Sequence, residues 1–171
     1  FKLTNKILTI TVSNISTYNI EYHNVFNTPN NKIISSLLAS GCIPFIHMPQ
    51  YINTSMYIDG GLYNSFPFSY IKNTKKIGFL VMNTHNYNII YNSNYNIKCK
   101  NLFDYLIHIN MNMCLYINKL NFDKFKYNKH IIHIIQNDDI NHYLNISKYS
   151  SNLFNNGIIS FLLWFKYSSK I

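Results

Sequence analysis

Leu37 to Phe68 reads LLASGCIPFIHMPQYINTSMYIDGGLYNSFPF and contains the only Asp-Gly-Gly of the chain, Asp59-Gly60-Gly61. The apolar residues directly before it, Met56 to Ile58, predict a short β-strand that ends where Asp59 begins. Two glycines after an acid permit a tight turn with positive φ and let another backbone come close. Because α/β enzymes tend to place functional groups at the C-terminal ends of strands, Asp59 is the first candidate for chemistry. Taken alone, the tripeptide is more simply explained as a turn.

The segments on both sides of Asp59 resemble the C-terminal half of the patatin-like phospholipase domain. In that family a helix ends in Ala-Ser-x-x-x-Pro, which stands here as Ala39 to Pro44. A strand then leads into Asp-Gly-Gly, and a turn with Asn and Pro follows, here Leu62 to Pro67. The position two before the last proline is often Asn in the family and is Ser65 here, with Asn64 one residue earlier. Ser65 is expected to make a similar local bond between side chain and backbone.

The resemblance implies catalysis by a Ser–Asp dyad, in which Asp59 is the acid and Gly60 and Gly61 shape its turn. In such a mechanism a serine within Gly-x-Ser-x-Gly attacks an ester carbonyl, the aspartate accepts its proton directly, and a Gly-rich loop donates N–H groups to the oxyanion. No serine of this chain stands in Gly-x-Ser-x-Gly, and its five glycines form no Gly-rich loop. In the family both parts precede the dyad aspartate. We therefore expect them upstream of Phe1, and we expect the 171 residues alone to be inactive.

Two residues close to Asp59 are weaker candidates for a nucleophile. Ser40 lies at the predicted helix end within Ala-Ser-Gly. The resemblance implies that this segment packs near the active site and does not react. Cys42 has no histidine close in sequence that would activate its thiol. Neither residue is expected to react.

The apolar loop before the acid has two interpretations. Its functional interpretation is one wall of an acyl-chain pocket, lined by Pro44, Phe45 and Met48, or a lip that touches a membrane. Its structural interpretation is a loop packed under the edge of the sheet, and this one is slightly favoured.

Hydrophobic periodicity predicts the elements around this block: strands at 6–12, 17–23, 76–82 and 130–135, and helices at 32–39, 102–120 and 152–166. The first two strands are expected to form a hairpin, and the two later ones to be buried strands of a parallel sheet. The helix at 102–120 is expected to bury the face that carries Leu106, Ile109 and Met113. The fold class is α/β. The resemblance implies a three-layer α/β/α patatin-like fold with a mainly parallel central sheet, incomplete at its N-terminal side.

The domain organisation follows from the same resemblance. Residues 1–171 are expected to be the C-terminal part of a single patatin-like phospholipase domain. The segment 83–98 is polar and rich in Asn and Tyr, which is typical of a surface loop or insert.

Composition narrows the class of partner. The formal net charge is +9, but all 15 cationic residues are lysines and they are scattered, which disfavours a nucleic-acid binder and suits anionic lipid headgroups. The cysteines, Cys42, Cys99 and Cys114, are unevenly spaced and indicate neither a disulfide framework nor a zinc site. His130 and His133 would point to opposite faces of a strand, so no metal or other cofactor is expected. We find no signal peptide and no apolar run that spans a bilayer, which favours an intracellular protein, cytoplasmic or peripheral to membranes.

These inferences give two hypotheses of different classes. The first is a lipid acyl hydrolase of the phospholipase A type, acting on phospholipid or neutral lipid with peripheral membrane contact. The second is a non-catalytic remnant, or a module that binds lipid surfaces, with the same fold. The oligomeric state is not indicated.

Overall fold

The computed structural model describes residues 6–72, 76–83, 99–136 and 157–166. The chain divides into two compact units, one formed by 1–67 and 98–117, the other by 68–97 and 118–171. That both are parts of one domain stays a prediction. Of the expected surface loop at 83–98, only Asn83 lies in the described residues, where it ends a strand. No helix of the described residues has the length and hydropathy that a bilayer crossing requires.

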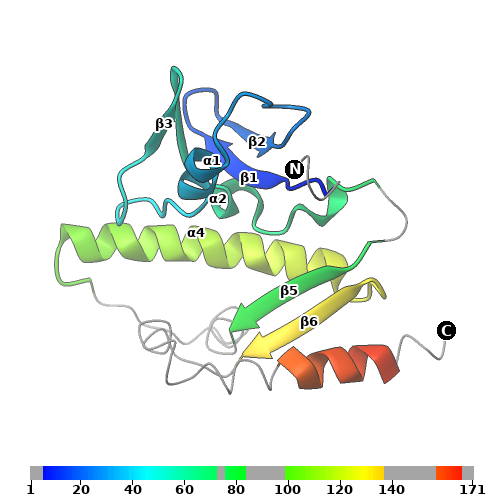
Figure 1. The fold of residues 1–171 in the computed structure, drawn as a ribbon. Helices are drawn as coiled ribbons and strands as arrows, with labels where there is room; N and C mark the ends of the chain where they lie inside the picture. Colours follow the sequence, from blue (N-terminus) through cyan, green and yellow to red (C-terminus); the bar gives the residue numbers. More distant parts are fainter. Residues whose placement is uncertain (1–5, 73–75, 84–98, 137–156, 167–171) are drawn as a thin grey trace. The chain divides into compact units, whose positions relative to one another are not determined.

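The first unit is built on a four-stranded sheet with the strand order β2-β1-β4-β3 (Figure 1). Its strands are β1 (Ile10–Asn14), β2 (Asn19–His23), β3 (Gln50–Ile52) and β4 (Ser55–Asp59). The predicted hairpin is confirmed as β1 and β2, although β1 begins later than expected. All three strand pairs are antiparallel.

The antiparallel pairing around Asp59 differs from the predicted parallel sheet, and a short connection explains it for β3 and β4. Only Asn53 and Thr54 join β3 to β4, and such a short loop can link only antiparallel neighbours. Asn53 has a φ of 55°, a left-handed conformation that asparagine tolerates. The interpretation of Gln50–Ile52 as part of the loop before the acid was wrong, because these residues form β3.

The predicted helix after the hairpin is confirmed as α1 (Ile33–Ser40). Its Ala39 packs in a core together with Ile10, Val12, Ile52 and Tyr57. Its opposite side is apolar but uncovered within the described residues, with Ile34 71% and Leu38 58% exposed. The helix therefore covers the sheet with one face and presents a second apolar face outward.

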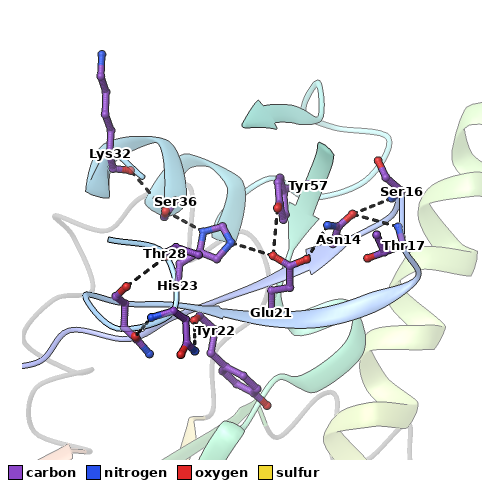
Figure 2. A network of polar contacts seen from close by, with 12 residues as sticks. Asn14, Ser16, Thr17, Glu21, Tyr22, His23, Thr28, Lys32, Ser36 and Tyr57 are labelled. Atoms are coloured by element: carbon purple, nitrogen blue, oxygen red, sulfur yellow. Dashed lines mark hydrogen bonds and ion pairs between the residues drawn. The ribbon is translucent and has the colours of Figure 1, made fainter. Parts of the chain in front are cut away.

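A network of polar side chains ties α1 to the sheet (Figure 2). The Glu21 carboxylate accepts hydrogen bonds from Asn14 Nδ2 at 2.6 Å and from Tyr57 Oη at 3.1 Å, and contacts His23 Nε2 at 3.3 Å. The other ring nitrogen of His23 lies 2.9 Å from Ser36 Oγ on α1. Asn14, His23 and Ser36 are each 2% exposed, so this network satisfies polar groups that burial would otherwise leave unpaired.

The second unit contains the parallel strands of the described residues, β5 (Gly78–Asn83) and β6 (Ile131–Gln136). Both predicted strands are confirmed. Burial in β5 alternates, because Leu80 is 6% exposed whereas Phe79 and Val81 are 58% and 49% exposed. One face of β5 is thus open within the described residues, which corrects the expectation of a strand buried on both faces.

The predicted helices are also found. The helix α4 (Leu102–Phe125) runs five residues beyond the predicted end, and its first part belongs to the first unit and its last part to the second. Its buried apolar residues are Leu115, Phe122 and Phe125, whereas Met113 is 47% exposed, so the predicted buried face was wrong. The last described helix covers 157–166, and the earlier part of its predicted range lies outside the described residues.

Candidate active site

Asp59 is the last residue of β4, as the sequence predicts. It pairs with Val12 of β1. Its N–H donates to the carbonyl of Cys42 at 2.9 Å, and its own carbonyl accepts from Ser13 Oγ at 2.8 Å. The sheet and the segment after α1 therefore fix the backbone of Asp59 from both sides.

The carboxylate of Asp59 is held by one hydrogen bond. Its Oδ1 accepts from the backbone N–H of Gly61 at 2.7 Å, the geometry of an Asx turn. Among the described residues, Oδ2 has no hydrogen-bond partner. One oxygen thus orients the side chain, and the other is unbonded within the described residues.

The two glycines after Asp59 make different close approaches. A Cβ on Gly60 would lie 2.2 Å from the carbonyl oxygen of Thr11 in β1, and one on Gly61 would lie 3.1 Å from Oδ1 of Asp59. The predicted close approach of another backbone is therefore confirmed at Gly60. The expected positive φ is wrong: Gly60 has a φ of −62°, and no glycine of the described residues has a positive φ. The chain turns instead directly into α2 (Gly61–Asn64).

Asn64 ends this short helix and makes a local bond between side chain and backbone of the kind expected for Ser65, for which it stays a prediction. Its Oδ1 accepts from the backbone N–H of Phe66 at 3.2 Å, and its Nδ2 donates to Tyr22 Oη at 3.2 Å. The turn after Asp59 is thereby tied to β2.

Asp59 lines a surface hollow of about 410 Å³. Polar side chains of Ser40, Asn64 and Ser65 share it with apolar ones, namely Leu8, Ile10, Leu37 and Pro67. Pro44, Phe45 and Met48, the predicted acyl-pocket residues, are not among the residues that line it. Phe45 is 50% and Met48 83% exposed, so these two side chains are not packed under the sheet edge either.

The electrostatics around Asp59 disfavour a cysteine nucleophile. Burial, and then the negative charge of Asp59, raise the pKa of the thiols of Cys42 and Cys114. Cys42 is 2% exposed, and its Sγ donates to the carbonyl of Met48 at 2.8 Å. A thiol in this environment stays protonated and unreactive.

The residues that line the hollow form no group of three close metal ligands within the described part of the chain. Of the described residues, the one group of three potential ligands that lie close together does not include Asp59. The histidine pair considered from the sequence is split, since His130 precedes β6 whereas His133 lies within it.

Comparisons with known proteins point to one family. Residues 1–71 match the model of the patatin-like phospholipase family, a range that begins before β1 and ends after Asp59 and its turn. A probable lipid hydrolase, 463L of Invertebrate iridescent virus 6, is 34% identical over 87 residues, which are 47% of this chain and 30% of that relative. The chain thus spans less than a third of the length of the curated relative it matches. No solved structure matches it.

Proposed function

We propose that this chain carries the acid of a Ser–Asp dyad in a patatin-like lipid acyl hydrolase. The observation that carries the proposal is the state of Asp59 inside the segment that matches the family. One carboxylate oxygen is fixed by Gly61, and the other has no partner among the described residues and belongs to a side chain that lines a hollow. The lipid hydrolase named among the relatives supports the same reaction class.

In the proposed mechanism Asp59 acts as the general base. A serine hydroxyl attacks the ester carbonyl carbon of a phospholipid or neutral lipid, and its proton passes to Oδ2 of Asp59. When the tetrahedral intermediate collapses, the alcohol leaves with that proton and an acyl-serine remains. Water then attacks the acyl-serine while Asp59 accepts its proton, and collapse of the second intermediate breaks the bond to the serine oxygen, which takes the proton back from Asp59 as the fatty acid is released. Since this chain has no Gly-x-Ser-x-Gly, the serine is supplied by a part of the protein outside these 171 residues.

Lipid-ester turnover by a longer protein that includes the nucleophile tests this assignment. Asp59→Asn is expected to lower kcat by about 10²–10⁴-fold, the usual contribution of a general base. The amide oxygen can still accept from Gly61, so the turn and the fold are kept. Asp123→Asn, on an exposed carboxylate of α4, is the control and is expected to leave kcat unchanged. Equal turnover by Asp59→Asn and the wild type would refute the assignment, as would turnover by the 171-residue chain alone.

The exposed loop before β3 is proposed to touch the membrane. Its lip, defined by Phe45, Ile46 and Met48, exposes 50%, 56% and 83% of these side chains, and the chain as a whole is strongly basic. Replacing Ile46 and Met48 together by serine is expected to weaken binding to anionic vesicles by about tenfold or more, given the value of burying such side chains. Tyr18→Ser, on an equally exposed aromatic side chain outside the lip, is the control. Unchanged vesicle binding by the double variant would show that the lip does not make this contact.

The second candidate is a module that binds lipid surfaces without catalysis. The same exposed lip and the absence of the nucleophile motif favour it. The two candidates differ in one result: the module keeps vesicle binding but never acquires Asp59-dependent turnover in a longer protein.

A further inference from the structure

A second cluster of reactive side chains lies at the start of α4, independent of Asp59. We propose that Cys99, Asp104 and His108 form a binding site for a divalent transition metal of the Zn²⁺ class. The thiol sulfur, a carboxylate oxygen and a ring nitrogen of these residues all lie within 4.8 Å of one another. The sequence predicts no metal site here, because its three cysteines are unevenly spaced and its histidines are scattered.

The distances within the cluster suit a small tetrahedral ion. His108 Nε2 and Asp104 Oδ1 are 3.4 Å apart. Zinc bonds of about 2.0–2.1 Å to nitrogen and oxygen, meeting at the tetrahedral angle, place two ligand atoms about 3.4 Å apart. The same geometry with a zinc–sulfur bond of about 2.3 Å places sulfur about 3.6 Å from nitrogen, so the present separation of at most 4.8 Å has to shorten by no more than about 1.2 Å. Cys99 is exposed, and its side chain is free to make this adjustment.

The surrounding backbone orients the ligands. Asp104 Oδ2 accepts from the backbone N–H of Lys100 at 2.9 Å, and Asp104 N–H donates to Asn101 Oδ1 at 2.8 Å, which caps the helix. The first bond occupies one carboxylate oxygen and leaves Oδ1 directed to His108. Because Asp104 and His108 are four residues apart on one helix, their separation is fixed by α4 itself. Hydrogen bonds of this kind position metal ligands in known sites.

A simpler explanation covers only two of the three residues. Asp104 as the acceptor of the Lys100 N–H and as an ion-pair partner of His108 accounts for both side chains, and partly exposed pairs of this kind stabilise little. It does not account for the thiol of Cys99 beside them. Thiolate and imidazole with one carboxylate favour zinc over Mg²⁺ or Ca²⁺, which prefer oxygen ligands.

The fourth ligand is expected to come from solvent. Asp104 and His108 line a surface hollow of about 530 Å³, so an ion can enter and keep a water molecule as its fourth ligand.

Cobalt(II) titration of the 171-residue chain tests the site, because Co²⁺ occupies zinc sites and reports its ligands. We expect one Co²⁺ per chain with intense visible bands of a tetrahedral ion and a near-ultraviolet band of a thiolate–cobalt bond. Zn²⁺ is expected to displace the cobalt and abolish both signals. Cys99→Ser should remove the thiolate band, and His108→Gln should weaken binding at least tenfold.

Matched variants separate the site from unspecific binding. Cys114→Ser removes a half-buried thiol later in the same helix and is expected to leave the spectrum unchanged. Asn101→Ala weakens the helix cap without removing a ligand, and is expected to keep the thiolate band. Since Cys99 is exposed, its replacement does not disturb folding, which circular dichroism verifies. The absence of a thiolate band in the wild type, or a band that persists in Cys99→Ser, would overturn the proposal.

Discussion

Gly60 is the residue on which the position of Asp59 most depends. A side chain at this position has no space, because an added Cβ would lie 2.2 Å from the carbonyl oxygen of Thr11 in the neighbouring strand. Backbone atoms of a paired strand cannot move aside as a flexible side chain does. The glycine therefore allows β1 to pass directly beside the turn that carries the acid.

Gly60→Ala is expected to lower the free energy of unfolding of the first unit by about 1–3 kcal/mol or more, the range for overpacked positions. Urea unfolding followed by circular dichroism measures it. Gly41→Ala is the control, since its added Cβ would meet its nearest atom at an ordinary 3.7 Å, and it is expected to change stability by less than about 0.5 kcal/mol. Equal stability of the two variants would show that β1 does not constrain this turn.

At the residue scale, sequence reasoning found the parts that a local motif specifies. The position of Asp59 at a strand end and the need for a close approach at Gly60 both follow from Asp-Gly-Gly after an apolar run. The partner that approaches, Thr11, lies 49 positions away from Gly60 and could not be named. The cluster of Cys99, Asp104 and His108 has one signal in the sequence. Asp104 and His108 are four positions apart on a predicted helix, and Cys99 lies just before that helix.

At the scale of the element, His133 connects β6 to α4. Its ring meets Phe122 edge-on at 5.2 Å, and among the described residues neither ring nitrogen has a hydrogen-bond partner. Burial lowers the pKa of His133 below its ordinary value of 6.5, because the charged ring would lose its hydration. This element is therefore sensitive to acid.

The second unit is expected to lose stability as the pH falls below about 6.5, because the unfolded chain then binds a proton that the buried ring does not. The loss continues until the pH reaches the lowered pKa, and stability is unaffected well above pH 6.5. The single tryptophan, Trp164, donates to the carbonyl of Lys129 beside β6 and reports unfolding by fluorescence.

His133→Phe keeps the ring packing and is expected to flatten this pH dependence. His130→Gln, at an exposed histidine just before β6, is the control and should retain it. An identical pH dependence in the His133 variant and the wild type would show that this ring is not responsible.

Elements with clear periodicity were predictable, and their environment was not. The apolar runs of β5 and β6 and the rhythm of α1 and α4 gave the right element types. The short β3 has three residues, too few to show a periodicity in the sequence. These residues form a strand because they pair with β4. The buried side of α4 depends on what packs against it, which the sequence alone does not contain.

At the scale of the whole molecule, long-range pairing is what sequence reasoning missed. The resemblance implied a mainly parallel sheet, whereas the strands next to Asp59 pair antiparallel and the parallel pair is β5 with β6. The polar network joins Tyr57 to Glu21 across 36 positions, and its one sequence signal is that the only glutamate of the chain sits within a predicted strand. Such contacts depend on how segments far apart in the sequence pair in the folded chain.

The most direct test of the central claim is the rate of fluorophosphonate labelling of a longer protein. It should contain this chain and an upstream half-domain of about 100–150 residues, and be compared with its Asp59→Asn form and with the chain alone. We predict that the longer wild-type protein is labelled and the chain alone is not, and that Asp59→Asn slows labelling of the longer protein by about 10²-fold or more, because the serine then has no base. Labelling of the folded Asp59→Asn protein at the wild-type rate would contradict the account.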